Sequence, residues 1–180
     1  MPSRLINELR NRIRDSHNSI CLESNDCKNK RRTVVCEENK TKIRFKCNLN
    51  QNSEILGFII DPNFEGRCNG KQDCHHNLEF EGTTCDGIII FEKETDIKVI
   101  FWELKGGDVE KAISQICNSI KNFERLYSSK TYNYKIRVVI AHTGGAPRKN
   151  KFPELKNYKP KIGNGSGKGL DITSYIFFED

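Results

Sequence analysis

Two acidic residues and a lysine stand where apolar runs of this sequence begin and end. Asp86 precedes the run 88–91, and Glu103 and Lys105 follow directly on the run 99–102. Both runs are rich in β-branched and aromatic side chains, which favour buried strands. Because side chains alternate along a strand, Glu103 and Lys105 share one face, and a hairpin brings Asp86 to the same end of the sheet. The sequence therefore predicts that two carboxylates and an ammonium converge.

This combination of side chains suits metal-assisted chemistry on a phosphodiester. Mg²⁺ and Mn²⁺ take oxygen ligands and keep positions open for water and for a phosphate oxygen. The ammonium of Lys105 can orient the attacking water or neutralise charge that develops on the phosphate. The alternative interpretation is a surface hairpin whose strands simply end in charged residues. The spacing of the two strands and the helical pattern that follows them favour the metal site.

Asp86 and the Glu-Leu-Lys triplet at 103–105 resemble the PD-(D/E)xK nuclease superfamily over about residues 86–142. That family opens one strand with Asp and closes the next with Glu-x-Lys, ahead of a helix; Cys85 stands here where the family has proline. The resemblance implies an α/β fold with a restriction-endonuclease-like core, in which helices flank a central mixed sheet. It also implies a Mg²⁺- or Mn²⁺-dependent endonuclease that cleaves nucleic acid, with DNA favoured and antiviral defence as a role.

The resemblance further implies supporting residues around the triplet. Asp86 and Glu103 would bind the metal with the carbonyl of Leu104, and an acidic residue of the first helix, Glu8, would join them. Gln115, in the helix after the two strands, would face the site as a catalytic supporting residue. The alternatives are a solvated Glu8 and an exposed Gln115.

Apolar residues at helical spacing predict two helices. The first covers residues 4–15, and the second covers 109–128 behind Asp108, which is a good N-cap. The second helix joins two strands, which should therefore be parallel. Segments 16–32 and 142–169 are polar and loop-like. The remaining predicted strands are 33–36 and 42–47, which form an additional β-hairpin insertion, together with 55–60, 135–141 and 174–178.

Length and charge bound the remaining possibilities. A chain of 180 residues can bury one sizeable core, so we expect a single domain over 1–180. The net charge of +6 favours a polyanionic partner, and Arg148, Lys149 and Lys151 are the candidate nucleic-acid-binding cations. No apolar run reaches membrane-spanning length, and a charged helix follows the first residues, so we expect a cytoplasmic protein without a membrane partner.

The eight cysteines admit two interpretations. A cytosolic location predicts free thiols, whereas a secreted one would predict disulfides. Metal-binding residue types crowd together at Cys68, Cys74, His75 and His76, but the spacing of the two cysteines is wider than in common zinc knuckles. We therefore favour a loop with small buried thiols over a structural Zn²⁺ site.

A second hypothesis comes from a different functional class. The chain would be a non-catalytic module that binds nucleic acid or protein within a larger assembly or a homo-oligomer, with the same fold. Metal-dependent cleavage separates this module from the nuclease.

Overall fold

Two β-sheets and two α-helices make up most of the part of the chain that the structure describes. The computed structural model describes residues 4–14, 20–23, 32–47, 53–70, 75–76, 78–128, 132–144, 152–168 and 170–173. The larger sheet has the order β1-β4-β6-β7-β8-β9, and the smaller sheet has the order β10-β3-β2-β5. The larger sheet contains β1 (Leu22–Glu23), β4 (Ser53–Ile59), β6 (Gly87–Lys93), β7 (Asp96–Lys105), β8 (Tyr134–His142) and β9 (Lys161–Asn164). The smaller sheet contains β2 (Arg32–Glu38), β3 (Thr41–Cys47), β5 (Arg67–Cys68) and β10 (Leu170–Thr173).

The larger sheet is mixed, as the sequence predicts. Strand β6 is antiparallel to both β4 and β7, and β7 is joined to β6 by a tight turn. Helix α3 (Val109–Leu126) then carries the chain across to β8, which is parallel to β7. The α/β class and the parallel pairing around the crossover helix are therefore confirmed.

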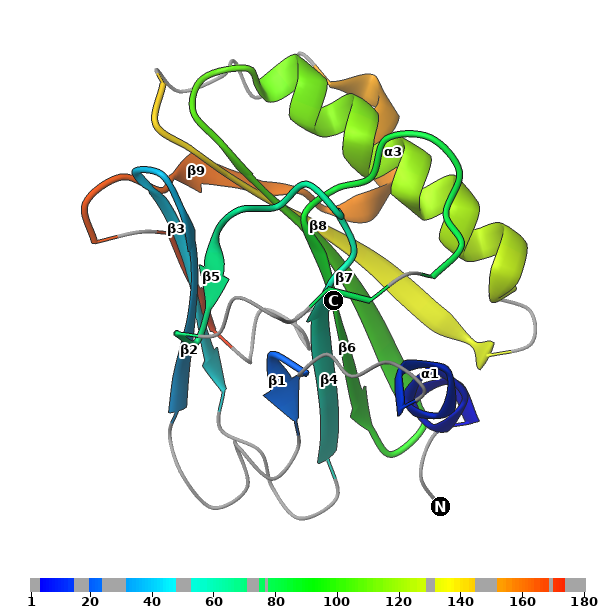
Figure 1. Cartoon of the computed structure of the whole chain (residues 1–180). Coiled ribbons are helices and arrows are strands. Elements are labelled where there is room, and N and C mark those ends of the chain that lie inside the picture. Colours follow the sequence, from blue (N-terminus) through cyan, green and yellow to red (C-terminus); the bar gives the residue numbers. More distant parts are fainter. Residues whose placement is uncertain are drawn as a thin grey trace.

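The helices lie on one face of the larger sheet, and the smaller sheet covers the other face (Figure 1). Apolar residues of α1 (Arg4–Arg14) and α3 pack with Ile88, Ile90 and Phe101 in one core. Val34 and Phe45 of the smaller sheet belong to a second core, against the opposite face. Among the described residues, the prediction of helices flanking the sheet is thus wrong for the second face of the larger sheet, which the β-hairpin insertion covers. Neither helix in the described ranges is long and apolar enough to cross a membrane.

Trp102 anchors the second core and sets the packing at the start of β6. Its ring lies edge-on to Phe45 and Phe64, with ring centroids 6.0 and 5.9 Å away. Its cross-strand partner is Gly87, where an added Cβ would lie 2.4 Å from the indole. A glycine directly after Asp86 is therefore required for the indole to pack against the β6 backbone.

Several elements form where the sequence predicted loops. Strand β1 lies within the predicted 16–32 loop, and η1 (Pro153–Tyr158) and β9 lie within the predicted 142–169 loop, which β10 follows. Proline opens η1, Leu155 is buried beneath it, and β9 pairs in parallel with the end of β8. These segments gain order from long-range contacts, which local pattern does not reveal. The predicted strand 174–178 lies outside the described residues.

A disulfide joins Cys36 to Cys68, so the prediction of free thiols is wrong for this pair. The two residues are cross-strand partners in β2 and β5, with Cα atoms 4.1 Å apart, a register that brings the sulfurs together. Cys21, Cys85 and Cys117 are free, as predicted.

The disulfide also bears on the Zn²⁺ alternative. It removes Cys68 as a thiolate ligand, and Cys74 lies outside the described residues. His75 Nδ1 lies 3.0 Å from the carbonyl oxygen of Asp61, and His76 packs edge-on against a phenyl ring.

Candidate active site

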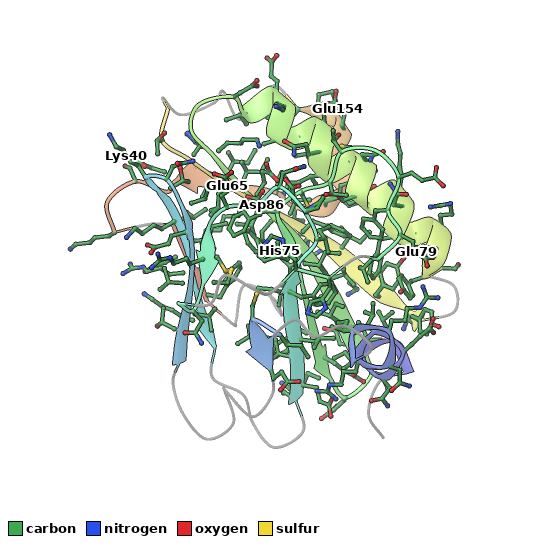
Figure 2. The ribbon with its side chains drawn as sticks, in the orientation of Figure 1. Lys40, Glu65, His75, Glu79, Asp86 and Glu154 are labelled. Atoms are coloured by element: carbon green, nitrogen blue, oxygen red, sulfur yellow. A yellow bond between two sulfur atoms is a disulfide. The ribbon has the colours of Figure 1, made fainter. Side chains whose placement is uncertain are left out.

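Asp86 and Glu103 interlock across β6 and β7 at one end of the larger sheet. The backbone N–H of Asp86 donates to Glu103 Oε2 at 2.9 Å, and the N–H of Leu104 donates to Asp86 Oδ2 at 2.6 Å. The pairing of β6 with β7 makes this contact direct, since Gly87 lies opposite Trp102 and the next pair outward is Asp86 with Glu103. The predicted convergence of the two carboxylates is confirmed. Figure 2 shows Asp86 between α3 and the smaller sheet.

Lys105 completes the group, as predicted. Its Nζ lies 2.6 Å from Glu103 Oε1, and its side chain keeps 21% exposure while that of Glu103 has none. The ammonium therefore connects a fully buried carboxylate to the surface. It is also the only cation that forms an ion pair with either carboxylate among the described residues.

Burial makes the two carboxylates hard to ionise. Loss of solvent raises the pKa of Asp86 well above its usual range, and the charge of Glu103 raises it further. Burial also raises the pKa of Glu103 to about 7, although the Lys105 ammonium opposes this shift. The pKa of Lys105 is itself raised, because the contact with Glu103 outweighs the effect of burial. If both carboxylates were ionised, the site would hold more negative charge than its one ammonium balances.

Two further acids add to this negative charge. Glu38, at the end of β2, raises the pKa of Asp86, and Asp61, after β4, raises that of Glu103. The side chain of Glu38 accepts a hydrogen bond from the N–H of Glu65, and that of Asp61 accepts one from the N–H of Asn63. Both acids are therefore held in place by local backbone contacts near the pair.

The donor set fits a hard divalent cation. Buried carboxylates with raised pKa values are stabilised in the ionised form by a nearby positive charge, and their oxygens are the ligands that Mg²⁺ prefers. The Lys105 ammonium already occupies such a position beside Glu103 Oε1. No group of three or more His, Cys, Asp or Glu residues in the described ranges is arranged to hold a metal. A cation here would therefore depend on two carboxylates, a carbonyl and water, which is usual for Mg²⁺.

A polar face of α3 holds the chain segment that leads into Asp86. Gln115 Nε2 donates to the carbonyl of Thr84 at 2.8 Å, and Ser119 Oγ accepts from the N–H of Cys85 at 2.8 Å. Asn118, one turn after Gln115, donates from Nδ2 to the carbonyl of Thr83 at 2.8 Å. These amides and hydroxyl satisfy backbone groups that no strand pairing reaches, so α3 determines where β6 begins and where the Asp86 side chain lies.

The predicted supporting residues differ in outcome. Gln115 is buried and is one of the α3 residues that hydrogen-bond to residues 83–85. It is therefore not the exposed helix residue of the alternative interpretation. Glu8 does not join the carboxylate pair, because it accepts a hydrogen bond from Tyr132 and lies 3.7 Å from Arg12. Tyr132 precedes β8, whose first residues pair with the far end of β7, and α1 packs there. Arg148, Lys149 and Lys151 lie outside the described residues.

His142 is a neighbour of the site that sequence reasoning did not single out. It ends β8 as the register partner of Lys105 and is 2% exposed. Its position directly after the predicted strand 135–141 was the available signal, since it parallels Glu103 after 99–102. Glu38 and Asp61 carried a similar signal, because each follows a predicted strand.

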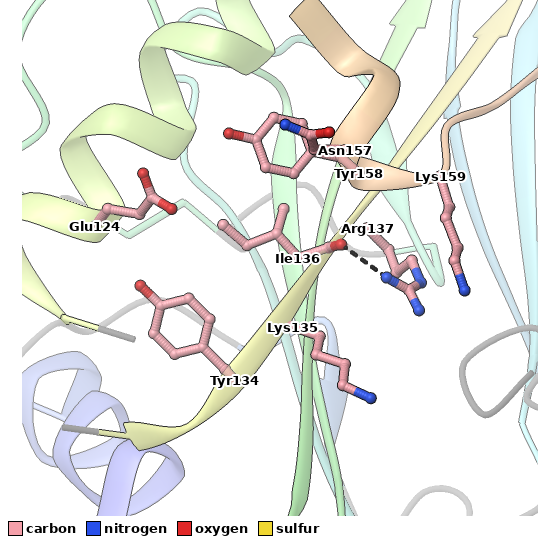
Figure 3. A pocket seen from close by; sticks show the side chains of 8 residues that line it. All are labelled: Glu124, Tyr134, Lys135, Ile136, Arg137, Asn157, Tyr158 and Lys159. Atoms are coloured by element: carbon pink, nitrogen blue, oxygen red, sulfur yellow. Dashed lines mark hydrogen bonds between the residues drawn. The ribbon is translucent and has the colours of Figure 1, made fainter. Parts of the chain in front are cut away.

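A separate pocket of about 390 Å³ lies between α3, the outer edge of β8 and η1 (Figure 3). Lys135, Arg137 and Lys159 line it together with Glu124. The β8 residues that line it pair with residues 97–100 of β7, several positions before Glu103. The pocket is therefore distinct from the carboxylate pair. Within it, Arg137 Nη1 donates a hydrogen bond to the neighbouring carbonyl of Ile136 at 3.2 Å.

No protein-family model, curated protein or solved structure matches this chain. Any function proposed for the chain therefore rests on its own residues and geometry.

Proposed function

We propose that this chain is a metal-dependent endonuclease with a restriction-endonuclease-like core, and that it hydrolyses phosphodiester bonds of nucleic acid, with DNA favoured. The observation that carries the proposal is the reciprocal bonding of Asp86 and Glu103, with the ammonium of Lys105 on the same carboxylate. Ordinary strand-end charges are exposed and unconnected. These two carboxylates are buried, at 3% and 0% exposure, which is a costly arrangement unless a cation compensates it.

The residues of the site divide into ligands and a charge stabiliser. Asp86, Glu103 and the carbonyl of Leu104 would hold Mg²⁺ or Mn²⁺. When bound, such a cation supplies Lewis-acid stabilisation of the phosphate and a lowered pKa of water. Lys105 reaches toward the surface from the same face, where its ammonium can orient water or neutralise charge that develops on the scissile phosphate.

The surrounding fold supports this division of roles. The site lies at the end of strand β7, and helix α3 follows it. Hydrogen bonds of Gln115 and Ser119 to residues 84–85 keep Asp86 opposite Glu103. Pre-organised ligands need no rearrangement of the backbone when a cation arrives. The net charge of +6 is consistent with a nucleic-acid partner.

The test is cleavage of supercoiled plasmid, single-stranded DNA and RNA in Mg²⁺, Mn²⁺ or EDTA. We expect cleavage in either metal and none in EDTA. Asp86→Asn and Glu103→Gln replace a carboxylate ligand by a neutral amide of the same size, and Lys105→Met removes one electrostatic stabiliser. Each should lower the rate by about 100-fold to 1,000-fold.

Glu124→Gln is the matched control, because Glu124 is an exposed acid at the far end of α3. It should cut like the unmodified chain. Full activity in EDTA, or in all three site variants, would reject a metal-dependent nuclease at this site. Binding of DNA without cleavage in any metal would favour the non-catalytic binding module instead.

A further inference from the structure

His142 is a buried polar group that the proposed catalytic roles leave unexplained. It is 2% exposed, and neither ring nitrogen makes a hydrogen bond with any residue in the described part of the chain. A neutral imidazole carries one donor and one acceptor. Because buried polar groups nearly always have partners, an imidazole with two unused nitrogens calls for an explanation.

The position of His142 relates it to one residue above all. It pairs with Lys105 in the parallel register of β7 and β8, and neighbouring strands lie about 4.8 Å apart. Ile140, two residues earlier in β8, belongs to the core under α3, as does Phe101 in β7. Side chains at alternate positions share a face, so His142, Glu103 and Lys105 all lie on the helix side of the sheet.

Backbone contacts hold the ends of β7, β8 and β9 together. The N–H of Thr143 donates to the carbonyl of Lys105 at 3.2 Å, and the N–H of Gly165 donates to the carbonyl of His142 at 2.8 Å. The bases of the lysine and histidine side chains are therefore fixed beside each other. Only the flexible part of the lysine is free to change partner.

A bound cation creates the need for such a change. In the structure the ammonium lies 2.6 Å from Glu103 Oε1, which is one of the few oxygens that a divalent cation at the pair would use. Two positive charges cannot share that oxygen at close range, because their repulsion is strong where water is excluded. The ammonium must then move, and the neighbouring imidazole offers an unused acceptor.

We propose that Lys105 has two partners, Glu103 while no cation is bound and His142 when a cation occupies the carboxylate pair. This inference rests on the proposed function of the pair as a cation site. His142 is then a positioning residue: it keeps the displaced ammonium inside the site, where it can act on a phosphate, and prevents its release to solvent.

The first test follows the imidazole nitrogens directly. In protein labelled with ¹⁵N-histidine, His142→Gln assigns the His142 signals among the four histidines. At pH 8, adding Mg²⁺ should move the acceptor nitrogen of His142 upfield, as a new hydrogen bond requires. The same addition to Lys105→Met should leave it unmoved. In Glu103→Gln, which deprives the ammonium of its carboxylate, the shift should be present without any metal.

The second test is a double-mutant cycle on Mn²⁺ affinity, measured by calorimetry. His142→Leu should weaken binding about tenfold, which corresponds to about 1.4 kcal/mol. His142→Gln retains an acceptor and should bind nearly as well as the unmodified chain. In the Lys105→Met background no ammonium needs a new partner, so His142→Leu should have no further effect.

The outcomes separate this inference from the proposed function. If Mn²⁺ binds but the His142 nitrogens do not respond, or if His142→Leu weakens binding equally with and without Lys105, the change of partner is refuted and the cation site stands. If Mn²⁺ does not bind, the cation site is refuted. The metal-free Glu103→Gln spectrum then decides alone: a shifted His142 nitrogen supports the second partner, and an unshifted one refutes it.

Discussion

Ser119 tests the idea that α3 positions the segment before Asp86. Its hydroxyl accepts a hydrogen bond from the N–H of Cys85 at 2.8 Å and donates one to the carbonyl of Gln115 at 3.0 Å, and its side chain has no exposed surface. Ser119→Ala keeps the helix but leaves the Cys85 N–H buried without a partner. An unsatisfied buried donor costs about 1–3 kcal/mol, so we expect the lost hydrogen bond by itself to lower the free energy of unfolding by about 2 kcal/mol.

Ser114 supplies the matched control, because it lies on the exposed side of the same helix. Ser114→Ala should raise stability by about 0.5 kcal/mol, since alanine is the better helix former. Ser119→Ala has the same propensity gain, so the difference between the two variants isolates the buried hydrogen bond. Urea titration should give a gap of about 2 kcal/mol, and thermal scans a gap of about 4–8 °C.

Hydrogen exchange gives a residue-level readout of the same change. The Cys85 amide should exchange faster in Ser119→Ala than in Ser114→Ala, because it no longer has an acceptor. Equal stability of the two variants, together with unchanged protection of the Cys85 amide, would refute the idea that α3 positions the segment before Asp86. The position of Asp86 would then have to come from β6 and β7 alone.

Three further outcomes follow from other features of the chain. Burial raises the pKa of Glu103 from 4.5 to about 7, so the folded chain binds its proton more tightly than the unfolded chain. The free energy of unfolding should therefore fall as pH rises from about 4.5 to about 7, with a smaller fall in Glu103→Gln, as urea titrations across this range would show. The Cys36–Cys68 disulfide spans 32 residues, and replacing both cysteines by serine should cost about 4 kcal/mol, while a non-reducing peptide map should contain the cross-linked peptide. Reversing the charge of three loop cations should flatten the salt dependence of duplex binding by about 0.9 per lost phosphate contact, and an unchanged slope would assign the loop to solvent. These cations are Arg148, Lys149 and Lys151.

Local pattern was sufficient to predict the carboxylate pair. Strands β6 and β7 are adjacent in sequence and joined by a short turn, so the alternation of side chains already places Asp86, Glu103 and Lys105 at one end of one face. The same holds for α3, whose apolar stripe and Asp108 cap are features of consecutive residues. The catalytic roles of these residues stay predictions, since they depend on chemistry and not on placement.

Contacts between distant segments were decided only by the tertiary structure. The period of a helix shows which of its faces is apolar but not where along the sheet it packs, so Glu8 could be assigned to the site although α1 lies toward the other end of β7. For the same reason the sequence left two interpretations of Gln115 open, a residue that faces the site and an exposed helix residue, and only its contact with the Thr84 carbonyl decides between buried and exposed.

The disulfide and His142 show the same division. Cys36 pairs with Cys68 because β5 returns to β2 from a loop, a register that no local pattern encodes. His142 lies beside Lys105 because a crossover helix of 18 residues makes β7 and β8 parallel neighbours. The sequence by itself determined strands β6 and β7, the crossover helix and the grouping of Asp86, Glu103 and Lys105, since each depends on residues close together in the chain. Only the packing of distant elements decided which other side chains surround those three charged residues.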